Sequence, residues 1–251
     1  MYTTDKLISL ATDLINSAGG KGILLRLLGG IAFYLHATKA KEVPAFTRIY
    51  KDLDFGVSMC NSANLISVFT ELGWKEEKEF NALHGNSRML FFYGENLDLQ
   101  ADVFVENFEQ CHNLSFKNSL SADSMTLPLS YLLLTKLQIH ELNSKDVSDI
   151  LMMLYDHDFG LEKKEETEEL KTIIDITSKD WGWYTTVTDN LAFIKTQLLE
   201  YVPKDDADRL RNTIAWLEKN ISEAQKSLKW KLRALIGRRI TWYELPEEVD
   251  K

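Results

Sequence analysis

Hydrophobic and polar positions follow two different periods in the first 115 residues, which predicts a mixture of helices and strands. Apolar residues recur at helical spacing over residues 7–15, so the segment that leads to Gly19 and Gly20 is expected to be a helix. Short runs that alternate residue by residue, or that are continuously apolar, predict strands. The expected strands cover residues 23–28, 50–57, 74–80, 88–93 and 97–106, and further helices are expected over residues 31–40 and 62–72.

The pattern changes after residue 115, where the apolar spacing becomes helical almost throughout. The expected helices cover residues 129–142, 145–155 and most of 168–236, with an interruption at 181–183. The charge run at 162–169 is expected to be a solvated helix start or loop. We therefore predict an α+β fold: a domain with a mixed sheet at residues 1–115, followed by a helical domain at residues 116–251.

Composition narrows the class of protein further. Apolar residues make up 45% of the chain, and 29 Lys and Arg against 38 Asp and Glu give a net charge of −9, which disfavours non-specific coating of nucleic acid. No apolar run reaches the roughly 18–20 residues of a membrane span, and no signal-peptide pattern opens the chain. Two cysteines, Cys60 and Cys111, are too few for a disulfide framework. We expect a cytoplasmic protein with no membrane partner.

The most informative polar positions are two acids in the strand expected at 50–57. Asp52 and Asp54 are two residues apart, so both side chains leave one face of the strand while the apolar residues take the other. Two carboxylates this close repel each other unless a cation neutralises them, and Mg²⁺ is the common hard cation with oxygen ligands. Taken alone, the pair also fits an exposed strand edge whose acids serve solubility.

A third acid lies on the strand expected at 97–106. Asp102 is flanked by Ala101 and Val103, as expected for a carboxylate that rises from a sheet interior. Beside a metal-binding pair, a third carboxylate completes metal binding or accepts the proton of an attacking hydroxyl in phosphoryl transfer. Asp98 competes for this role, although it stands next to an expected turn, and a surface acid in an amphipathic strand is the alternative for Asp102.

Gly29 and Gly30 lie where an expected strand leads into an expected helix. Without Cβ atoms they let a phosphate approach the backbone, and the N–H groups and dipole of the following helix favour negative charge there. A plain tight turn is the alternative. No Walker or dinucleotide-binding glycine pattern is present.

Together these motifs resemble the nucleotidyltransferase fold of the DNA-polymerase-β superfamily, which combines a Gly-Gly turn with an Asp-x-Asp strand and a third Asp on a later strand. The sequence is more similar still to the AbiEii-like toxin nucleotidyltransferases and to a bacterial branch of predicted nucleotidyltransferases. The resemblance covers roughly residues 20–155. The matching motifs are Gly29-Gly30-Ile31-Ala32, Arg48-x-x-x-Asp52-Leu53-Asp54-Phe55, Ala101-Asp102-Val103, Lys136-Leu137 and Asp146-Val147-Ser148-Asp149.

The resemblance implies an enzyme that transfers a nucleoside monophosphate from an NTP to an acceptor hydroxyl with two Mg²⁺ ions. The implied catalytic and metal-binding residues are Asp52, Asp54 and Asp102, and the implied nucleotide-binding residues are Gly29, Gly30, Arg48, Lys136, Asp146 and Asp149. Toxin relatives imply RNA, in particular tRNA ends, as the acceptor and an antitoxin protein as a partner. Antibiotic-modifying relatives imply a small-molecule acceptor instead. A non-catalytic nucleotide-binding regulatory module is the alternative from another class.

The sequence also departs from the family pattern. The gap from Gly30 to Asp52 is longer than usual, which implies an inserted loop at about 38–47. Ile31 stands where many relatives have Ser or Thr, so a hydroxyl contact to phosphate is missing. Neither departure removes a predicted metal ligand.

Several later motif residues have a simpler structural explanation. Lys136 also fits a solvent-facing position on its helix. Asp146 and Asp149 also fit acids that stabilise a helix start, with Ser144 as the cap. The basic stretch at 226–239 is a candidate site for RNA phosphates, but a solvated helix face is the favoured interpretation.

Overall fold

The computed structural model describes residues 2–162 and 164–245, and the chain forms two compact units. Lys163, which belongs to the predicted charge run, and residues 246–251 of the predicted helical domain lie outside the described residues. The first unit comprises Met1–His36, Arg48–Phe108 and Leu114–Pro128, and the second comprises Ala37–Thr47, Glu109–Asn113 and Leu129–Lys251.

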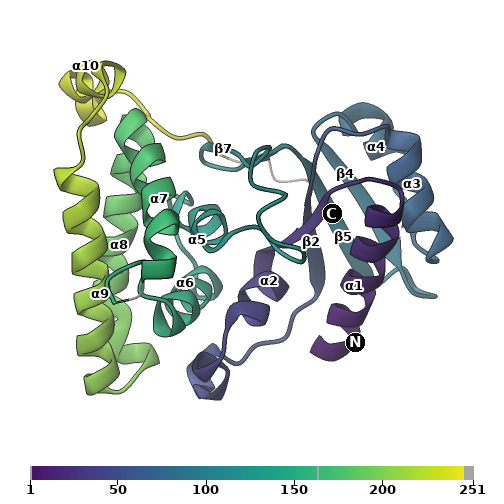
Figure 1. The fold of residues 1–251 in the computed structure, drawn as a ribbon, viewed down its shortest axis with the longest axis horizontal. Coiled ribbons are helices and arrows are strands. Elements are labelled where there is room, and N and C mark those ends of the chain that lie inside the picture. The colour runs from purple at the N-terminus through teal and green to yellow at the C-terminus, as the bar shows by residue number, and fades with distance from the viewer. Residues whose placement is uncertain (1, 163, 246–251) are drawn as a thin grey trace. The chain divides into compact units, whose positions relative to one another are not determined.

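The first unit is built on a five-stranded mixed sheet with the strand order β1-β2-β5-β4-β3 (Figure 1). Strand β2 pairs in parallel with β5 and antiparallel with β1, while β4 pairs antiparallel with both β5 and β3. The strands are β1 (Leu25–Leu28), β2 (Asp52–Val57), β3 (Lys75–Glu76), β4 (Arg88–Tyr93) and β5 (Leu99–Val105). A separate two-stranded sheet is formed by β6 (Asn107–Glu109) and β7 (Asn113–Ser115).

Four helices accompany the five-stranded sheet: α1 (Thr4–Gly20), α2 (Gly29–His36), α3 (Ser62–Glu71) and α4 (Lys78–His84). The alternation predicted for the central strands is confirmed, because Leu53, Phe55 and Val103 on one face of the sheet are fully buried. Two of these helices are capped by the residue that directly precedes the helix. The side chains of Thr3 and Asn61 accept backbone N–H bonds at the starts of α1 and α3.

Two element predictions in the first half of the chain are wrong. The strand expected at 74–80 is limited to β3, because the next residues form α4. The Asn81 side chain of α4 bonds both backbone groups of Leu90, at 2.7 and 3.1 Å, and so takes the place of a longer neighbouring strand. The helix expected at 31–40 ends at His36. Beyond it, the Asp156 carboxylate accepts backbone N–H bonds from three consecutive residues, Thr38, Lys39 and Ala40, and two 3-10 turns follow.

The second unit is helical. Its helices are α5 (Leu129–Leu137), α6 (Ser144–Asp156), α7 (Thr167–Lys179), α8 (Trp181–Tyr201), α9 (Lys204–Glu223) and α10 (Leu228–Ile236). The helix expected at 129–142 ends early, where the Asn190 amide donates to the carbonyls of Leu137 and Ile139. The interruption expected at 181–183 is misplaced: these residues begin α8, and the break is the single residue Asp180, whose carboxylate caps that helix.

The predicted charge run, residues 162–169, leads into the start of α7, and one of its acids is buried. The Glu166 carboxylate accepts the backbone N–H of Phe159 at 2.7 Å and lies 3.2 Å from Nδ1 of His157. The solvated interpretation therefore fails at Glu166, which ties the turn after α6 to the start of α7.

The fold class predicted from sequence is confirmed: a mixed sheet is followed by a helical C-terminal region. The observed division differs from the predicted boundary at 115/116 in three places. Segment 109–113, within the predicted sheet domain, belongs to the helical unit. Segment 114–128 stays with the sheet because Leu27 exchanges backbone hydrogen bonds with Met125 and Leu127. Segment 37–47, the expected insertion, belongs to the helical unit. Among the described residues, no helix has the length and apolar character needed to cross a membrane.

Candidate functional site

The turn between β1 and α2 requires glycine at its first position. Gly29 has a φ of +67°, in the left-handed region that side chains with a Cβ rarely adopt. A Cβ at Gly29 would also overlap the carboxylate of Asp54, which faces the turn because Leu28 and Asp54 are paired in register. The glycine therefore lets an acid of β2 lie directly against the backbone at the start of a helix.

The second glycine of the turn accommodates a cation. A Cβ at Gly30 would overlap the guanidinium of Arg48 and would lie 2.9 Å from the ring of Tyr50. The guanidinium carbon of Arg48 also lies 4.6 Å from the centre of that ring. Arg48, which the resemblance alone marked as nucleotide-binding, is thus placed beside the glycine turn.

The acids of β2 and β5 share one face of the sheet. Asp52 is exposed and Asp54 is half-buried on this face, while Leu53 between them is buried on the other. Because β2 and β5 are parallel with Asp54 opposite Asp102, those two side chains are neighbours. The competing acid, Asp98, lies outside β5, is exposed, and accepts a hydrogen bond from the Tyr2 hydroxyl at 3.3 Å.

Sequence reasoning missed the residue that contacts Asp102 most closely. Arg88 of β4 donates from Nε and Nη2 to the two Asp102 oxygens at 2.6 and 2.8 Å, and the Gln100 amide donates to one of them at 3.0 Å. The bonds to Asp102, aided by the charge of Asp54, raise the pKa of Arg88, although burial opposes this. The available signal was a cation at the start of the apolar strand that directly precedes the strand of Asp102.

A divalent cation fits part of this acidic face. The carboxylates of Asp52 and Asp54 are the oxygen donors that Mg²⁺ prefers, and they lie on the same face of one strand. The Asp102 oxygens are already engaged by Arg88. Within residues 2–162 and 164–245, no group of three or more His, Cys, Asp or Glu side chains is arranged to hold a metal ion. The residues present therefore fit a cation on Asp52 and Asp54 better than one on all three acids.

The later motif residues form a cluster of their own in the second unit. Nζ of Lys136 on α5 lies 2.8 Å from Asp146 and 3.3 Å from Asp149, both on α6. Both acids are buried, Asp149 completely. The solvent-facing interpretation of Lys136 is wrong, since its ammonium joins two helices. The cap of α6 is Asn143, in place of the expected Ser144, and Asp146 completes a capping box with it.

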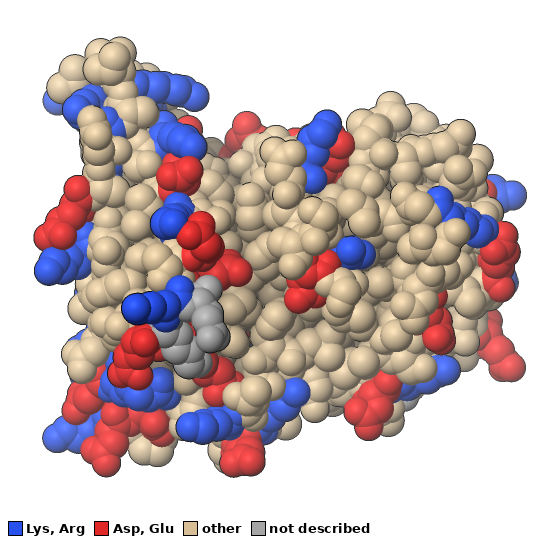
Figure 2. All heavy atoms as spheres, viewed as in Figure 1, with Lys and Arg blue, Asp and Glu red and all other residues tan. Residues whose placement is uncertain are grey.

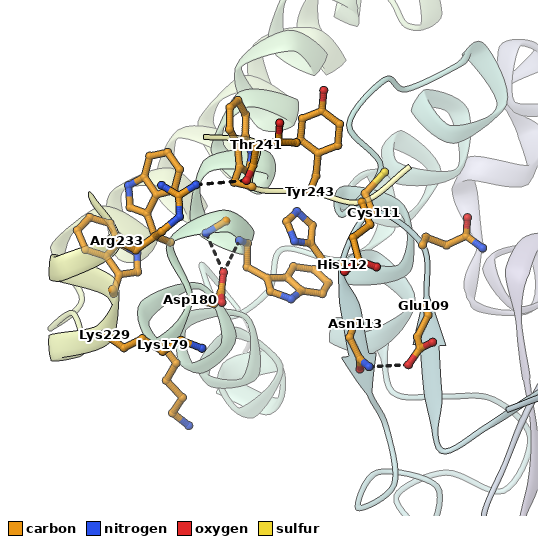
Figure 3. A pocket seen from close by; sticks show the side chains of 17 residues that line it. Glu109, Cys111, His112, Asn113, Lys179, Asp180, Lys229, Arg233, Thr241 and Tyr243 are labelled. Atoms are coloured by element: carbon orange, nitrogen blue, oxygen red, sulfur yellow. Dashed lines mark hydrogen bonds between the residues drawn. The ribbon is translucent and has the colours of Figure 1, made fainter. Parts of the chain in front are cut away.

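A cavity of about 640 Å³ in the second unit is a rival site (Figure 3). Lys179, Lys229 and Arg233 lie on one side of it and Glu109 on the opposite side. Its aromatic rings already have partners within the chain. Arg233 lies 4.7 Å from the centre of the Trp181 ring, Arg238 lies 5.1 Å from that of Trp242, and His140 stacks on Tyr243 at 3.7 Å. The cavity is thus lined by rings that are occupied in packing.

The histidine in the wall of this cavity is structural. His112 is buried, and burial lowers its pKa to about 4, so its ring is neutral at pH 7. Its Nε2 lies 2.8 Å from Oγ1 of Thr186. The neighbouring Cys111 accepts the backbone N–H of His140 on its sulfur. These contacts account for the pair without a metal.

The basic stretch expected at 226–239 forms α10 and the turn after it. Lys and Arg side chains gather over α10 in Figure 2. Arg233 and Arg238 are engaged within the chain, by backbone carbonyls and by Asp189, respectively. Leu232 and Leu235 on the same helix are 66% and 80% exposed, so any surface that covers α10 meets apolar as well as basic groups.

No family model matches this chain, and no curated protein matches it either. The candidate residues are therefore described as two separate sets, each within one unit. The first unit holds Gly29, Gly30, Arg48, Asp52, Asp54 and Asp102 with Arg88, and the second unit holds the cluster of Lys136, Asp146 and Asp149.

Proposed function

We propose that this protein is a metal-dependent nucleotidyltransferase, which transfers a nucleoside monophosphate from an NTP to an acceptor hydroxyl and releases pyrophosphate. The observation that carries the proposal is the position of Asp54. Its carboxylate lies against the Gly29 backbone at the start of α2 and beside Asp102 on the neighbouring parallel strand. A phosphate-binding turn and acidic side chains are thereby next to each other.

The turn offers a place for the triphosphate. The first N–H groups of a helix lack partners within the helix, and the helix dipole adds positive potential there. The Arg48 guanidinium lies against Gly30 at this helix start and adds a full positive charge. These features favour a polyphosphate over a neutral ligand.

Asp52 and Asp54 would hold Mg²⁺, which supplies positive charge to phosphate oxygens during the transfer. Asp102 is paired with Arg88, and its predicted role as a third ligand or base remains a prediction. Lys136, Asp146 and Asp149 likewise keep their predicted role in nucleotide binding. The acceptor, RNA or a small molecule, an antitoxin partner and a cytoplasmic location are further parts of the proposal.

One observation favours a second candidate, a non-catalytic nucleotide-binding module. Arg88 engages both oxygens of Asp102, as expected where a former metal ligand has taken a structural role. Such a module binds NTP at the glycine turn but does not transfer it.

The two candidates separate in one experiment. The protein is incubated with each α-labelled NTP, Mg²⁺, and either total cellular RNA or a small-molecule extract. We expect label transfer by the wild type and by Asp98→Asn, which changes an exposed acid outside the strand, and no transfer by Asp54→Asn. NTP binding without transfer to either pool supports the binding module. Neither binding nor transfer contradicts both candidates.

A further inference from the structure

We propose that the outer face of α10 binds an anionic lipid surface, so that the protein associates reversibly with a membrane without spanning it. The outer face comprises the exposed residues Leu228, Lys229, Lys231, Leu232, Leu235 and Ile236. The inference goes beyond the proposed function and does not depend on it. The expectation of no membrane partner rests on spanning segments and signal peptides, and a helix that lies in the plane of a membrane surface needs neither.

The inner face of α10 is fixed against the rest of the helical unit. The Ser227 side chain caps the start of the helix by accepting the backbone N–H of Trp230 at 3.1 Å. The Trp230 ring packs edge-on against Tyr184 with 5.1 Å between the ring centres, and the Arg233 guanidinium lies over Trp181. These contacts hold the helix in one orientation and present its outer face as a defined surface.

Aliphatic side chains form a stripe along the outer face. Leu228, Leu232, Leu235 and Ile236 recur at the spacing that places side chains on one side of a helix with 3.6 residues per turn. All four are exposed, so the most apolar side chains of α10 point away from the unit on which the helix packs. A helix of a globular protein normally turns such a stripe toward the core. Contiguous exposed apolar surface of this kind marks an interaction site.

Cations border the aliphatic stripe on both sides. At 3.6 residues per turn, Lys229 and Lys231 fall on opposite edges of the stripe, and both are exposed. Arg239 adds a third exposed cation in the turn after α10. Residues 224–243 contain no Asp or Glu, although the whole chain has a net charge of −9. An apolar stripe with Lys and Arg along its edges is typical of helices that lie in the surface of an anionic membrane.

The composition of the outer face favours lipid over the other possible partners. Protein-binding surfaces are enriched in aromatic residues and depleted in Lys, whereas here Trp230 packs inward and the outer face consists of Leu, Ile and Lys. Single-stranded RNA is bound by cations together with aromatic rings, and aliphatic side chains offer no stacking surface. A second copy of the same face would bring like charges together. A lipid surface provides anionic head groups for the cations and hydrocarbon for the aliphatic stripe.

The test is co-sedimentation of the full chain with vesicles of phosphatidylcholine, either alone or mixed with phosphatidylglycerol. We expect the wild type to bind the mixed vesicles, to bind the neutral vesicles much more weakly, and to lose affinity as salt is added. Leu232→Gln/Leu235→Gln should weaken binding to the mixed vesicles at least about tenfold, because two apolar side chains no longer enter the lipid. Lys229→Gln/Lys231→Gln should also weaken it at least about tenfold.

The chain offers a matched control for the leucine variant. Leu199 on α8 is as exposed as Leu232, at 66%, and Leu83 on α4 is as exposed as Leu235, at 80%. Leu83→Gln/Leu199→Gln therefore removes the same amount of exposed apolar side chain away from α10. This variant should bind the mixed vesicles as the wild type does.

Several results would overturn the proposal. The first is a wild type that does not bind the mixed vesicles, or that binds the neutral ones equally well. The second is an α10 leucine variant that binds like the wild type, or a control variant that loses as much affinity. If circular dichroism shows the leucine variant to be unfolded, the two kinds of vesicle with the wild type and the lysine variant decide.

Two further measurements identify another partner if vesicles do not bind. A wild-type dimer in light scattering that becomes a monomer in Leu232→Gln/Leu235→Gln assigns the outer face to a second copy of the chain. Retention of polyuridylate on a filter by the wild type but not by Lys229→Gln/Lys231→Gln assigns its cations to RNA. Either result, without vesicle binding, replaces the lipid proposal.

Discussion

At the scale of single residues, the candidate site depends on a few residues that cannot be substituted without changing the local structure. Gly29 is required twice, by its positive φ and by the Asp54 carboxylate that fills the space of a Cβ. Gly22 offers a comparison, because its φ is +72° but no heavy atom lies within 4 Å of the position that a Cβ would take. Substitutions at the two glycines therefore distinguish the effect of backbone strain from the effect of steric overlap.

Gly29→Ala is expected to destabilise the protein more than Gly22→Ala. The backbone strain alone costs about 1–3 kcal/mol at either position. At Gly29 the new methyl group also displaces Asp54, so the loss of stability is larger, and the proposed transferase activity should fall with it. Urea unfolding measures both variants, and equal losses would show that the Asp54 contact contributes nothing.

His112 predicts a pH dependence with a definite sign. Its folded pKa is about 4 and its ordinary value is 6.5, so between these pH values the unfolded chain binds a proton that the folded chain does not. The free energy of unfolding should therefore fall, by up to about 1.4 kcal/mol per pH unit, as the pH drops from 6.5 to 4. In His112→Gln this part of the slope should vanish. Parallel wild-type and variant curves in urea titrations would refute the assignment.

At the scale of elements, polar side chains decide where helices and strands end. The Asn81 side chain bonds the backbone of β4 where a neighbouring strand would pair with it. The Asp156 carboxylate accepts backbone N–H bonds just after α2, and the Asn190 amide donates to the last carbonyl groups of α5. In each case a single side chain satisfies backbone groups that the regular element would have paired. Lys136 belongs to the same class, since it joins α5 to two buried acids of α6.

Lys136→Ala is expected to cost stability as well as any nucleotide affinity. Asp146 and Asp149 would lose their shared cation while buried, and breaking a buried ion pair on one side costs about 3–5 kcal/mol. Lys195 is the control, because its 2.6 Å pair with Glu218 is more exposed, and Lys195→Ala should cost at most about 1 kcal/mol. Thermal unfolding of the two variants provides the measurement. If Lys136→Ala were as stable as the wild type, the structural role of Lys136 would be contradicted, and ligand binding would be its only proposed role.

At the scale of the whole molecule, a net charge of −9 coexists with a basic stretch at 226–239. Among its exposed cations, Arg238 pairs with Asp189, whereas Lys229, Lys231 and Arg239 have no ion pair within the described part of the chain. If RNA is the acceptor, these are the groups that meet its phosphates, and the acidic remainder keeps non-specific binding weak.

Binding of RNA should therefore depend on salt through these three residues. Each phosphate contact to a single strand contributes about 0.7 to the slope of log K against log salt, so replacing all three cations with Ala should reduce the slope by about 2. Filter binding at several salt concentrations gives the slopes. An unchanged slope would place the RNA elsewhere or favour a small-molecule acceptor.

The sequence by itself determined the α+β class, the central strands and the shared face of Asp52 and Asp54, because these follow from local periodicity. Side chains two residues apart in a strand point the same way whatever the rest of the chain does. Likewise, Gly29 and Gly30 marked the turn before α2, since a strand-to-helix turn leaves a local signal.

Only the tertiary structure decided which partners these residues have. Arg88 and Asp102 are 14 positions apart and meet only because β4 pairs with β5, and Lys136 meets Asp149 only because α5 packs on α6. No local pattern encodes such contacts. They depend on which elements pair and in which register, and that is decided by burial of the apolar faces of the whole chain.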